Sequence, residues 1–172
     1  RRHRQIGGEL RALRERALRP GEEARRQEIL EGRERVGCRG IEAAEQQLAY
    51  FNRYFGVRYP FGKLDIIGIP DFAAGAMENA GAITFRERIL LVDPERSSID
   101  VRKNVASVIA HEIAHQWFGN AVTEHDWNDI WLSEGFATYF TLLYTEHAEG
   151  RDAFADGLRR SRTTVLALEK KL

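Results

Sequence analysis

Apolar side chains recur every three or four residues over several parts of the chain, which is the spacing that forms one face of a helix. The first such part spans residues 41–55 and is followed by Gly56, a residue type that commonly ends helices. The strongest pattern spans residues 101–118, and further helices are predicted at 133–147 and 152–172. Most of the chain after residue 100 is therefore expected to be helical.

Polar and small residues mark where two of these helices begin and end. Ser98 or Asp100 can cap the start of the second helix by accepting a hydrogen bond from a free backbone N–H. Gly119-Asn120 is predicted to end this helix, and Ser133 is predicted to cap the next one. The connection between the two helices is irregular in pattern and rich in tryptophan.

Extended segments are predicted between the first two helices. Residues 63–69 are β-branched and apolar and lie between a glycine and a proline, as is typical of a strand. Shorter strands are predicted at 83–85 and 89–92, and the small residues of 75–79 suit an exposed loop or a sheet edge. A small sheet followed by several helices indicates an α+β fold, with residues 41–172 as its domain.

The first 40 residues differ in composition from the rest of the chain. They contain twelve Arg, seven Glu and no aromatic residue, so they are predicted to form a solvated helix or to be disordered. The interleaved glutamates, and a formal net charge of zero for the whole chain, argue against a nucleic-acid partner. No apolar run is long enough to span a membrane and no signal peptide is recognisable, which slightly favours a cytoplasmic location.

Residues 111–115 place two histidines and a glutamate within the strongest predicted helix. Because residues four apart share one helical face, His111 and His115 can reach one metal ion, with Glu112 beside them as a general base. Zinc binds imidazole and carboxylate ligands tetrahedrally, and three protein ligands leave the fourth position for water. The alternative is a helix face that binds nothing, but the many apolar neighbours argue for burial, and buried histidines need partners.

The third metal ligand is left open by the spacing alone. A metzincin would have a histidine where this chain has Ala121, so that class is excluded. A carboxylate on the next predicted helix is another common arrangement, and Glu134 lies at its start, 19 residues after His115. Rival ligands lie in the connection between the helices, where charged residues are usually solvated: Glu124, His125, Asp126 and Asp129.

Three segments together resemble one family. They are Gly75-Ala-Met-Glu-Asn79, then HEIAHQWFGN from His111, then WLSEGFATYF from Trp131. In order and spacing they are similar to the zinc aminopeptidases of the alanyl aminopeptidase (aminopeptidase N) type, which are gluzincins with a thermolysin-like catalytic domain. The resemblance covers roughly residues 45–150.

The resemblance implies how this chain would bind its metal. One Zn²⁺ per chain would be held by His111, His115 and Glu134. Glu112 would act as the general base that takes a proton from the water on this zinc. The chain would then be an incomplete thermolysin-like catalytic domain.

The resemblance also implies the substrate. Glu78 would bind the free α-amino group of a peptide, and the backbone of Gly75 and Ala76 would line the peptide. A carboxylate clamp near the zinc allows one residue to be removed at a time, so peptides with a free N-terminus are the expected substrates.

The chain departs from the family pattern at several points. The family's transition-state tyrosine is expected beyond Leu172, and Tyr139 and Tyr144 are expected to pack in the core instead. Thr141 replaces an acidic residue that supports a zinc histidine in many members. The family's upstream β-rich domain and C-terminal helical domain are not recognisable either, so the chain is interpreted as a fragment.

Two alternative functions follow from these departures. One is a truncated zinc-binding module with weak or no catalytic activity, which the missing tyrosine favours for the chain in isolation. The other is epoxide hydrolysis with the same zinc, as in the leukotriene-hydrolase branch of the family. The intact Glu112 favours peptide hydrolysis.

Overall fold

The computed structural model describes residues 40–93 and 96–169 of the chain. The prediction of a solvated or disordered segment at 1–40 therefore lies outside the described residues, apart from Gly40, which begins the first described helix. That helix spans residues 40–55, as its periodicity predicts, and Gly56 follows it with a φ of 63°. The left-handed conformation suits glycine because it has no Cβ.

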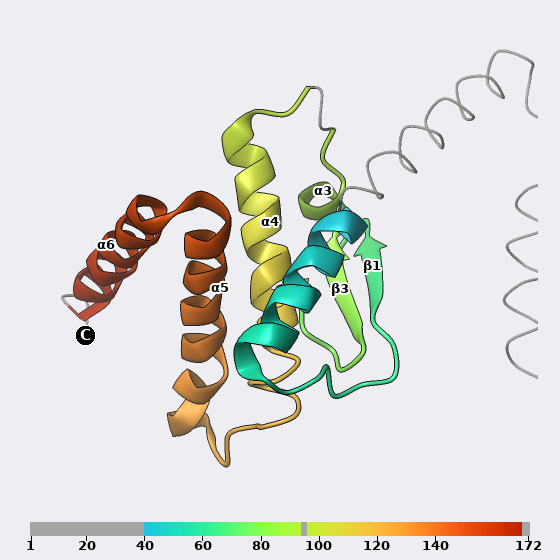
Figure 1. Ribbon diagram of the computed structural model, residues 1–172, viewed down its shortest axis with the longest axis horizontal. Coiled ribbons are helices and arrows are strands. Elements are labelled where there is room, and N and C mark those ends of the chain that lie inside the picture. Colours follow the sequence, from blue (N-terminus) through green and yellow to red (C-terminus); the bar gives the residue numbers. More distant parts are fainter. Residues whose placement is uncertain (1–39, 94–95, 170–172) are drawn as a thin grey trace, which may run out of the picture. The chain divides into compact units, whose positions relative to one another are not determined.

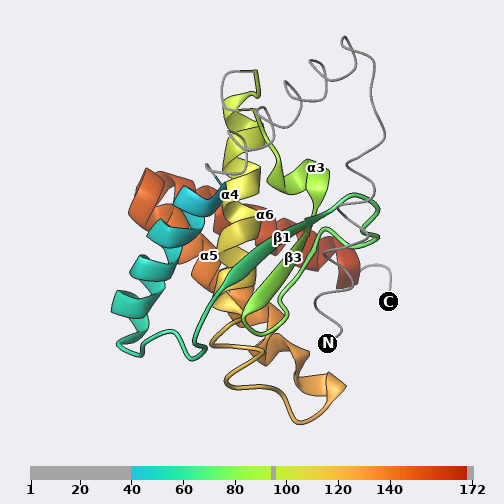
Figure 2. The same cartoon turned by 90° about the vertical axis from the view of Figure 1, so that its right-hand side faces the viewer.

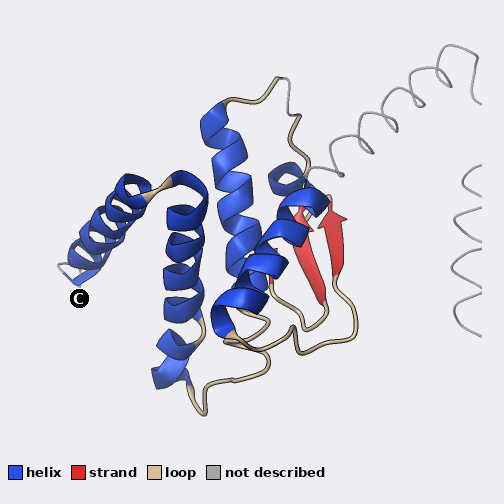
Figure 3. Cartoon of the chain, in the orientation of Figure 1, coloured by secondary structure: helices blue, strands red, loops and turns tan. Residues whose placement is uncertain are grey.

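The remaining elements are three short strands and several helices, arranged as Figure 1 and Figure 3 show. In chain order they are β1 (Asp65–Ile69), β2 (Ala76–Met77), β3 (Ala82–Arg86), α3 (Glu87–Leu90), α4 (Ile99–Ala114), the 3-10 helix η1 (Trp127–Leu132), α5 (Glu134–Glu149) and α6 (Arg151–Glu169). A small sheet followed mainly by helices is an α+β arrangement, which confirms the predicted class. Each described helix is too short or too polar to cross a lipid bilayer.

Strand β3 lies in the middle of the sheet. It pairs in parallel with β1 and antiparallel with β2, with Ile66 opposite Ile83 and Ala76 opposite Phe85. Alternate side chains of β3 point to one face, so Ile83 and Phe85 are both fully buried. The sheet therefore presents an apolar face from its central strand.

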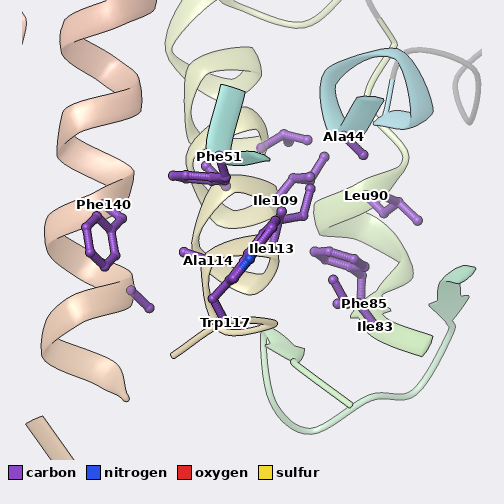
Figure 4. Packing of buried hydrophobic residues seen from close by; sticks show 13 residues of the cluster. Ala44, Phe51, Ile83, Phe85, Leu90, Ile109, Ile113, Ala114, Trp117 and Phe140 are labelled. Carbon is purple, nitrogen blue, oxygen red and sulfur yellow. The ribbon is translucent and has the colours of Figure 1, made fainter. Parts of the chain in front are cut away.

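Helix α4 lies between the sheet and α5, and α6 packs on the other side of α5 (Figure 1 and Figure 2). The apolar residues Ile109 and Ile113 of α4 are buried in one cluster with Ile83, Phe85 and other core residues (Figure 4). The cluster also includes Phe51 of the first helix, which is fully buried. Helix α4 is thus surrounded by packed neighbours, which holds its C-terminal end in place.

A buried amide joins the first helix to α4. Gln47 is fully buried, and its side-chain N–H donates to the carbonyl oxygen of Ala106 at 2.7 Å. Buried polar side chains need such partners, so this bond fixes the two helices against each other.

The start of α4 is as predicted, but its end is not. The Ser98 hydroxyl accepts a hydrogen bond from the Val101 N–H at 3.3 Å, which makes Ser98 the cap. The helix ends at Ala114 rather than at residue 118. The reason is that the N–H groups of Gln116 and Trp117 donate to carbonyls only three residues back, those of Ile113 and Ala114, which tightens the chain into turns.

The predicted strand at 89–92 is wrong. Residues Glu87–Leu90 instead form α3, a single helical turn in which the Leu91 N–H donates to the Glu87 carbonyl. This turn brings Leu90 into the core cluster, where it is buried. An apolar run of four residues is compatible with either a strand or a turn, and packing decides between them.

Two further expectations about the α5 region need correction. The connection before α5 is not irregular throughout, because Trp127–Leu132 form the 3-10 helix η1, capped by the Asp126 side chain. Tyr144 packs against the core as expected, but Tyr139 is 44% exposed. The Tyr139 ring lies against Phe154 of α6 and outside the core cluster.

Candidate metal centre

Helices α4 and α5 run in opposite directions, so the last turn of α4 lies beside the first turn of α5 (Figure 1). His111 lies in the last turn of α4, His115 directly follows the helix as its C-cap residue, and Glu134 is the first residue of α5. The distances between their polar atoms are 3.0 Å from His111 Nε2 to His115 Nε2, 3.1 Å from His111 Nε2 to Glu134 Oε2, and 3.6 Å from His115 Nε2 to Glu134 Oε2. Three potential ligand atoms therefore converge on one point.

These distances fit a tetrahedral metal ion. Ligand atoms about 2.0–2.1 Å from a tetrahedral Zn²⁺ lie about 3.3 Å from one another. The three observed separations, 3.0, 3.1 and 3.6 Å, lie on either side of that value. Two imidazoles and a carboxylate are also a donor set that zinc accepts. The residues present therefore fit a metal ion in both spacing and chemistry.

The hydrogen bonds of His115 fix its tautomer. Its Nδ1 lies 3.1 Å from the carbonyl oxygen of Phe118, which can only accept a hydrogen bond. The proton of a neutral His115 is therefore on Nδ1, and Nε2 keeps a free lone pair that faces His111 and Glu134. A ligand histidine held in this way by its second nitrogen is the usual arrangement at metal sites.

Ser133 lies against the same imidazole. It occupies the N-cap position of α5, as predicted, but its hydroxyl makes no cap hydrogen bond. Instead Ser133 Oγ lies 3.1 Å from His115 Nδ1, and the residue is only 4% exposed. The side chain predicted to stabilise the start of α5 is thus used to hold His115.

Gly119 makes room for this contact. Its φ is 129°, and a Cβ at this position would lie 2.8 Å from Ser133 Oγ and 3.0 Å from His115 Nδ1. Any larger residue would therefore push against both side chains, besides adopting an unfavourable backbone conformation.

Burial shapes the protonation of His111. Burial and the neighbouring His115 lower the pKa of His111 below its ordinary value of 6.5, while Glu134 acts in the opposite direction. The imidazole is therefore neutral at pH 7, which is the form that binds metal ions.

Glu112 lies beside these groups on α4 and is 6% exposed. Its Oε2 has no hydrogen-bond partner among the described residues. Burial, and then the charges of Glu78 and Glu134, raise the pKa of Glu112 to about 8. A buried carboxylate without a partner is costly, so it has a strong tendency to accept a proton or to lie beside a cation.

The loop between β2 and β3 brings a third carboxylate, after Glu112 and Glu134, to the site. Glu78 is half-buried there, and its charge helps to raise the pKa of Glu112 and partly opposes the lowering of the pKa of His111. This carboxylate is therefore near both the candidate ligands and the candidate base.

A cavity of about 360 Å³ lies beside the candidate ligands. Gly75 and Ala76 line it together with His111 and Glu112, and Thr138, Thr141 and Leu142 form its other side. The two residues predicted to line a peptide thus border the same space as the candidate ligand His111 and the candidate base.

The rival ligands lie apart from this site. Within the described residues, the group able to hold a metal ion consists of His111, His115 and Glu134. His125 is 96% exposed at its side chain and lies beside Asp126. Thr141, which stands where an acidic residue was expected, donates its hydroxyl proton to the Ala137 carbonyl within α5.

Sequence reasoning missed three polar residues that hold this site together. Ser133 was assigned to the helix cap and the half-buried Asn120 to the end of the helix, and the buried Gln116 was given no role. One signal was available, because Gln116 lies between His115 and the apolar pair Trp117-Phe118, within a segment expected to be buried. A polar residue in such a place must have a partner.

Comparison with known proteins matches most of the chain to one family. The Peptidase family M1 domain matches residues 39–170. Endoplasmic reticulum aminopeptidase 2 of Bos taurus is 56% identical over 103 residues, which are 60% of this chain and 11% of that protein. Aminopeptidase N of Canis lupus familiaris is 55% identical over 102 residues, 59% of this chain and 10% of that protein.

Glutamyl aminopeptidase of Sus scrofa is 55% identical over 100 residues, 58% of this chain and 11% of that protein. The chain thus spans about a tenth of the length of these relatives. The similarity to three aminopeptidases agrees with the family that the three sequence motifs indicate. With its family domain covering residues 39–170 and its two histidines and glutamate gathered on α4 and α5, the chain belongs to peptidase family M1.

Proposed function

We propose that this chain forms the metal-binding and proton-transfer part of a zinc aminopeptidase. The observation that carries the proposal is the convergence of three ligand atoms beside the buried carboxylate of Glu112. The chain is similar to three aminopeptidases, although it spans only about a tenth of each. Its sheet, α4 and α5 would be part of a thermolysin-like catalytic domain.

Zinc is the metal that suits these ligands best. Imidazole nitrogens and a carboxylate oxygen at tetrahedral spacing favour Zn²⁺ over the hard cations, which prefer six or more oxygens. His111, His115 and Glu134 would hold it. When bound, zinc polarises a peptide carbonyl and makes a water molecule acidic enough to attack it near neutral pH.

Glu112 would take the proton of the attacking water. The charge of a bound metal ion would favour the ionised form of Glu112 that accepts this proton, and its burial and unpartnered oxygen favour the protonated form after the transfer. The same carboxyl group could then give the proton to the amine that leaves. One side chain can serve both steps because Glu112 borders the same cavity as the candidate ligand His111.

Glu78 would select the substrate. A carboxylate binds the ammonium group of a peptide N-terminus through charge-assisted hydrogen bonds, each worth about 1.5–3 kcal/mol. Gly75 and Ala76 border the same cavity as His111, so a peptide lying there would have its N-terminus near Glu78. Peptides with a free α-amino group are therefore the proposed substrates.

The metal content of the purified chain and its cleavage of peptides test this proposal together. We expect about one zinc per chain, and cleavage of a peptide with a free N-terminus but not of its N-acetylated copy. Glu134→Ala should lose the zinc because only two ligands remain. Asp129→Ala, which removes a rival carboxylate outside the cluster, should keep it.

The possible outcomes separate two proposals. A folded chain without zinc would contradict the proposed site. Zinc binding without any cleavage would favour the alternative of a metal-binding module with weak or no activity.

The contact between Ser133 and His115 gives a second prediction. Ser133→Ala removes the hydroxyl 3.1 Å from Nδ1 and leaves the ligand atoms in place. Loss of a group that orients a ligand histidine typically lowers metal affinity by about 10–100-fold, and we expect a loss in this range from competition with a chelating dye. Ser98→Ala is the control, because the Ser98 hydroxyl caps α4 at its other end. An equal loss of zinc affinity in both variants would contradict the role of Ser133.

A further inference from the structure

The backbone of the loop that carries Glu78 is held by two side chains from one short segment. The Glu78 carbonyl oxygen accepts a hydrogen bond from Gln116 Nε2 at 2.8 Å and another from Asn120 Nδ2 at 2.6 Å. A carbonyl oxygen has two lone pairs, so both of its acceptor positions are used. The backbone at Glu78 is therefore fixed from two directions.

Gln116 also holds the far side of the same loop. Its Oε1 accepts a hydrogen bond from the Gly81 N–H at 3.0 Å, and the Tyr59 hydroxyl lies 3.4 Å from the same oxygen. The amide nitrogen donates to the Glu78 carbonyl and, at 3.4 Å, to the Glu112 carbonyl, while the amide oxygen accepts from the Gly81 N–H, which defines the orientation of the group. Because Gln116 is fully buried, water cannot replace either bond.

The two anchoring residues belong to the segment that follows the metal-binding histidine. Gln116 is the residue after His115, and the Asn120 N–H donates to the His115 carbonyl oxygen at 3.0 Å. The anchors therefore link the backbone of Glu78 to the backbone of His115 through only a few bonds. A shift of this loop relative to the metal ligands would break several buried hydrogen bonds at once.

We propose that Gln116 and Asn120 are positioning residues that set the place of the Glu78 carboxylate relative to the metal, and with it the preference for a free α-amino group. The inference rests on the proposed function, in which Glu78 binds that group. A charge-assisted hydrogen bond loses strength steeply when its geometry is poor, so the loop must be held firmly. Neither residue needs to touch the substrate for this effect.

The test compares two zinc-binding ligands that differ only in the α-amino group. Leucine hydroxamate carries this group, and 4-methylpentanehydroxamic acid lacks it. The ratio of their dissociation constants on the zinc-loaded full chain measures the preference for the amino group alone. In the unmodified chain we expect a preference of roughly tenfold or more, and in Glu78→Ala a preference near one.

Gln116→Glu and Asn120→Ala test the anchors. Gln116→Glu keeps the size of the side chain but places an oxygen where the amide donated to the Glu78 carbonyl. In both variants we expect the preference to fall to about twofold or less, while zinc content and the affinity for the ligand without the amino group stay within about twofold. Gln47→Glu is the matched control, because Gln47 is equally buried and donates to the Ala106 carbonyl far from Glu78.

The outcomes separate this inference from the proposed function. A preference that persists in folded Gln116→Glu and Asn120→Ala, but is lost in Glu78→Ala, would overturn the positioning role and leave the proposed function intact. If Gln116→Glu does not fold, the preference measured for Asn120→Ala alone tests the positioning role. This variant is expected to fold because Asn120 is only half-buried. No preference in the unmodified chain would overturn both.

Discussion

Replacing Glu112 by glutamine is expected to lower the rate of peptide hydrolysis by roughly 10²–10⁴-fold and to leave zinc binding unchanged. Glutamine has nearly the same size as glutamate but cannot accept a proton at its amide. Glu112 is 6% exposed, and its Oε2 has no hydrogen-bond partner among the described residues. Replacing this oxygen by an amide group therefore breaks no hydrogen bond there that stabilises the fold. The loss should therefore be confined to the chemical step.

Rates of release of the N-terminal residue and zinc content of the same sample measure this effect. Glu45→Gln is the control, because Glu45 is exposed on the first helix. Loss of zinc together with loss of rate would show that Glu112 supports the metal site rather than transfers a proton. An unchanged rate in a zinc-loaded Glu112→Gln protein would exclude it as the base.

The main elements could be predicted because their sequence periodicity and their burial agree. Residues 41–55 and 101–118 have apolar side chains on one face, and those faces are buried against the sheet. Two of the three candidate ligands, His111 and His115, could be predicted from their spacing, which places them on one helical face. Spacing left the third ligand open, and the family resemblance selected Glu134, which is the first residue of α5.

The features that could not be predicted depend on contacts between distant parts of the chain. Residues 89–92 carry no local signal that separates a strand from a turn, and the packing of Leu90 decides between them. A serine before a helix usually caps it, yet Ser133 contacts His115, 18 residues earlier. The partner of Gln116 lies 38 residues away, in the loop of Glu78. Sequence shows that such polar groups need partners but does not show which ones.

Gly119 links the stability of the fold to the metal site. Its φ of 129° is rarely adopted by residues with a side chain, and a Cβ there would lie 2.8 Å from Ser133 Oγ. Gly119→Ala combines backbone strain with a steric clash, which together should lower the free energy of unfolding by about 2–5 kcal/mol. The displaced His115 should also weaken zinc binding by about 10–100-fold.

Gly56→Ala is the control, because it introduces backbone strain without a steric clash. Gly56 also has a positive φ, of 63°, but a Cβ there would meet nothing within 4 Å. Replacing Gly56 by alanine should therefore lower the free energy of unfolding only by the strain of the left-handed conformation, about 1–2 kcal/mol, and leave zinc affinity unchanged. Urea unfolding and a zinc competition assay on both variants make the comparison. We expect zinc affinity to fall in Gly119→Ala and not in Gly56→Ala. Unchanged zinc affinity in both variants would contradict a role of Gly119 in the approach of Ser133 to His115.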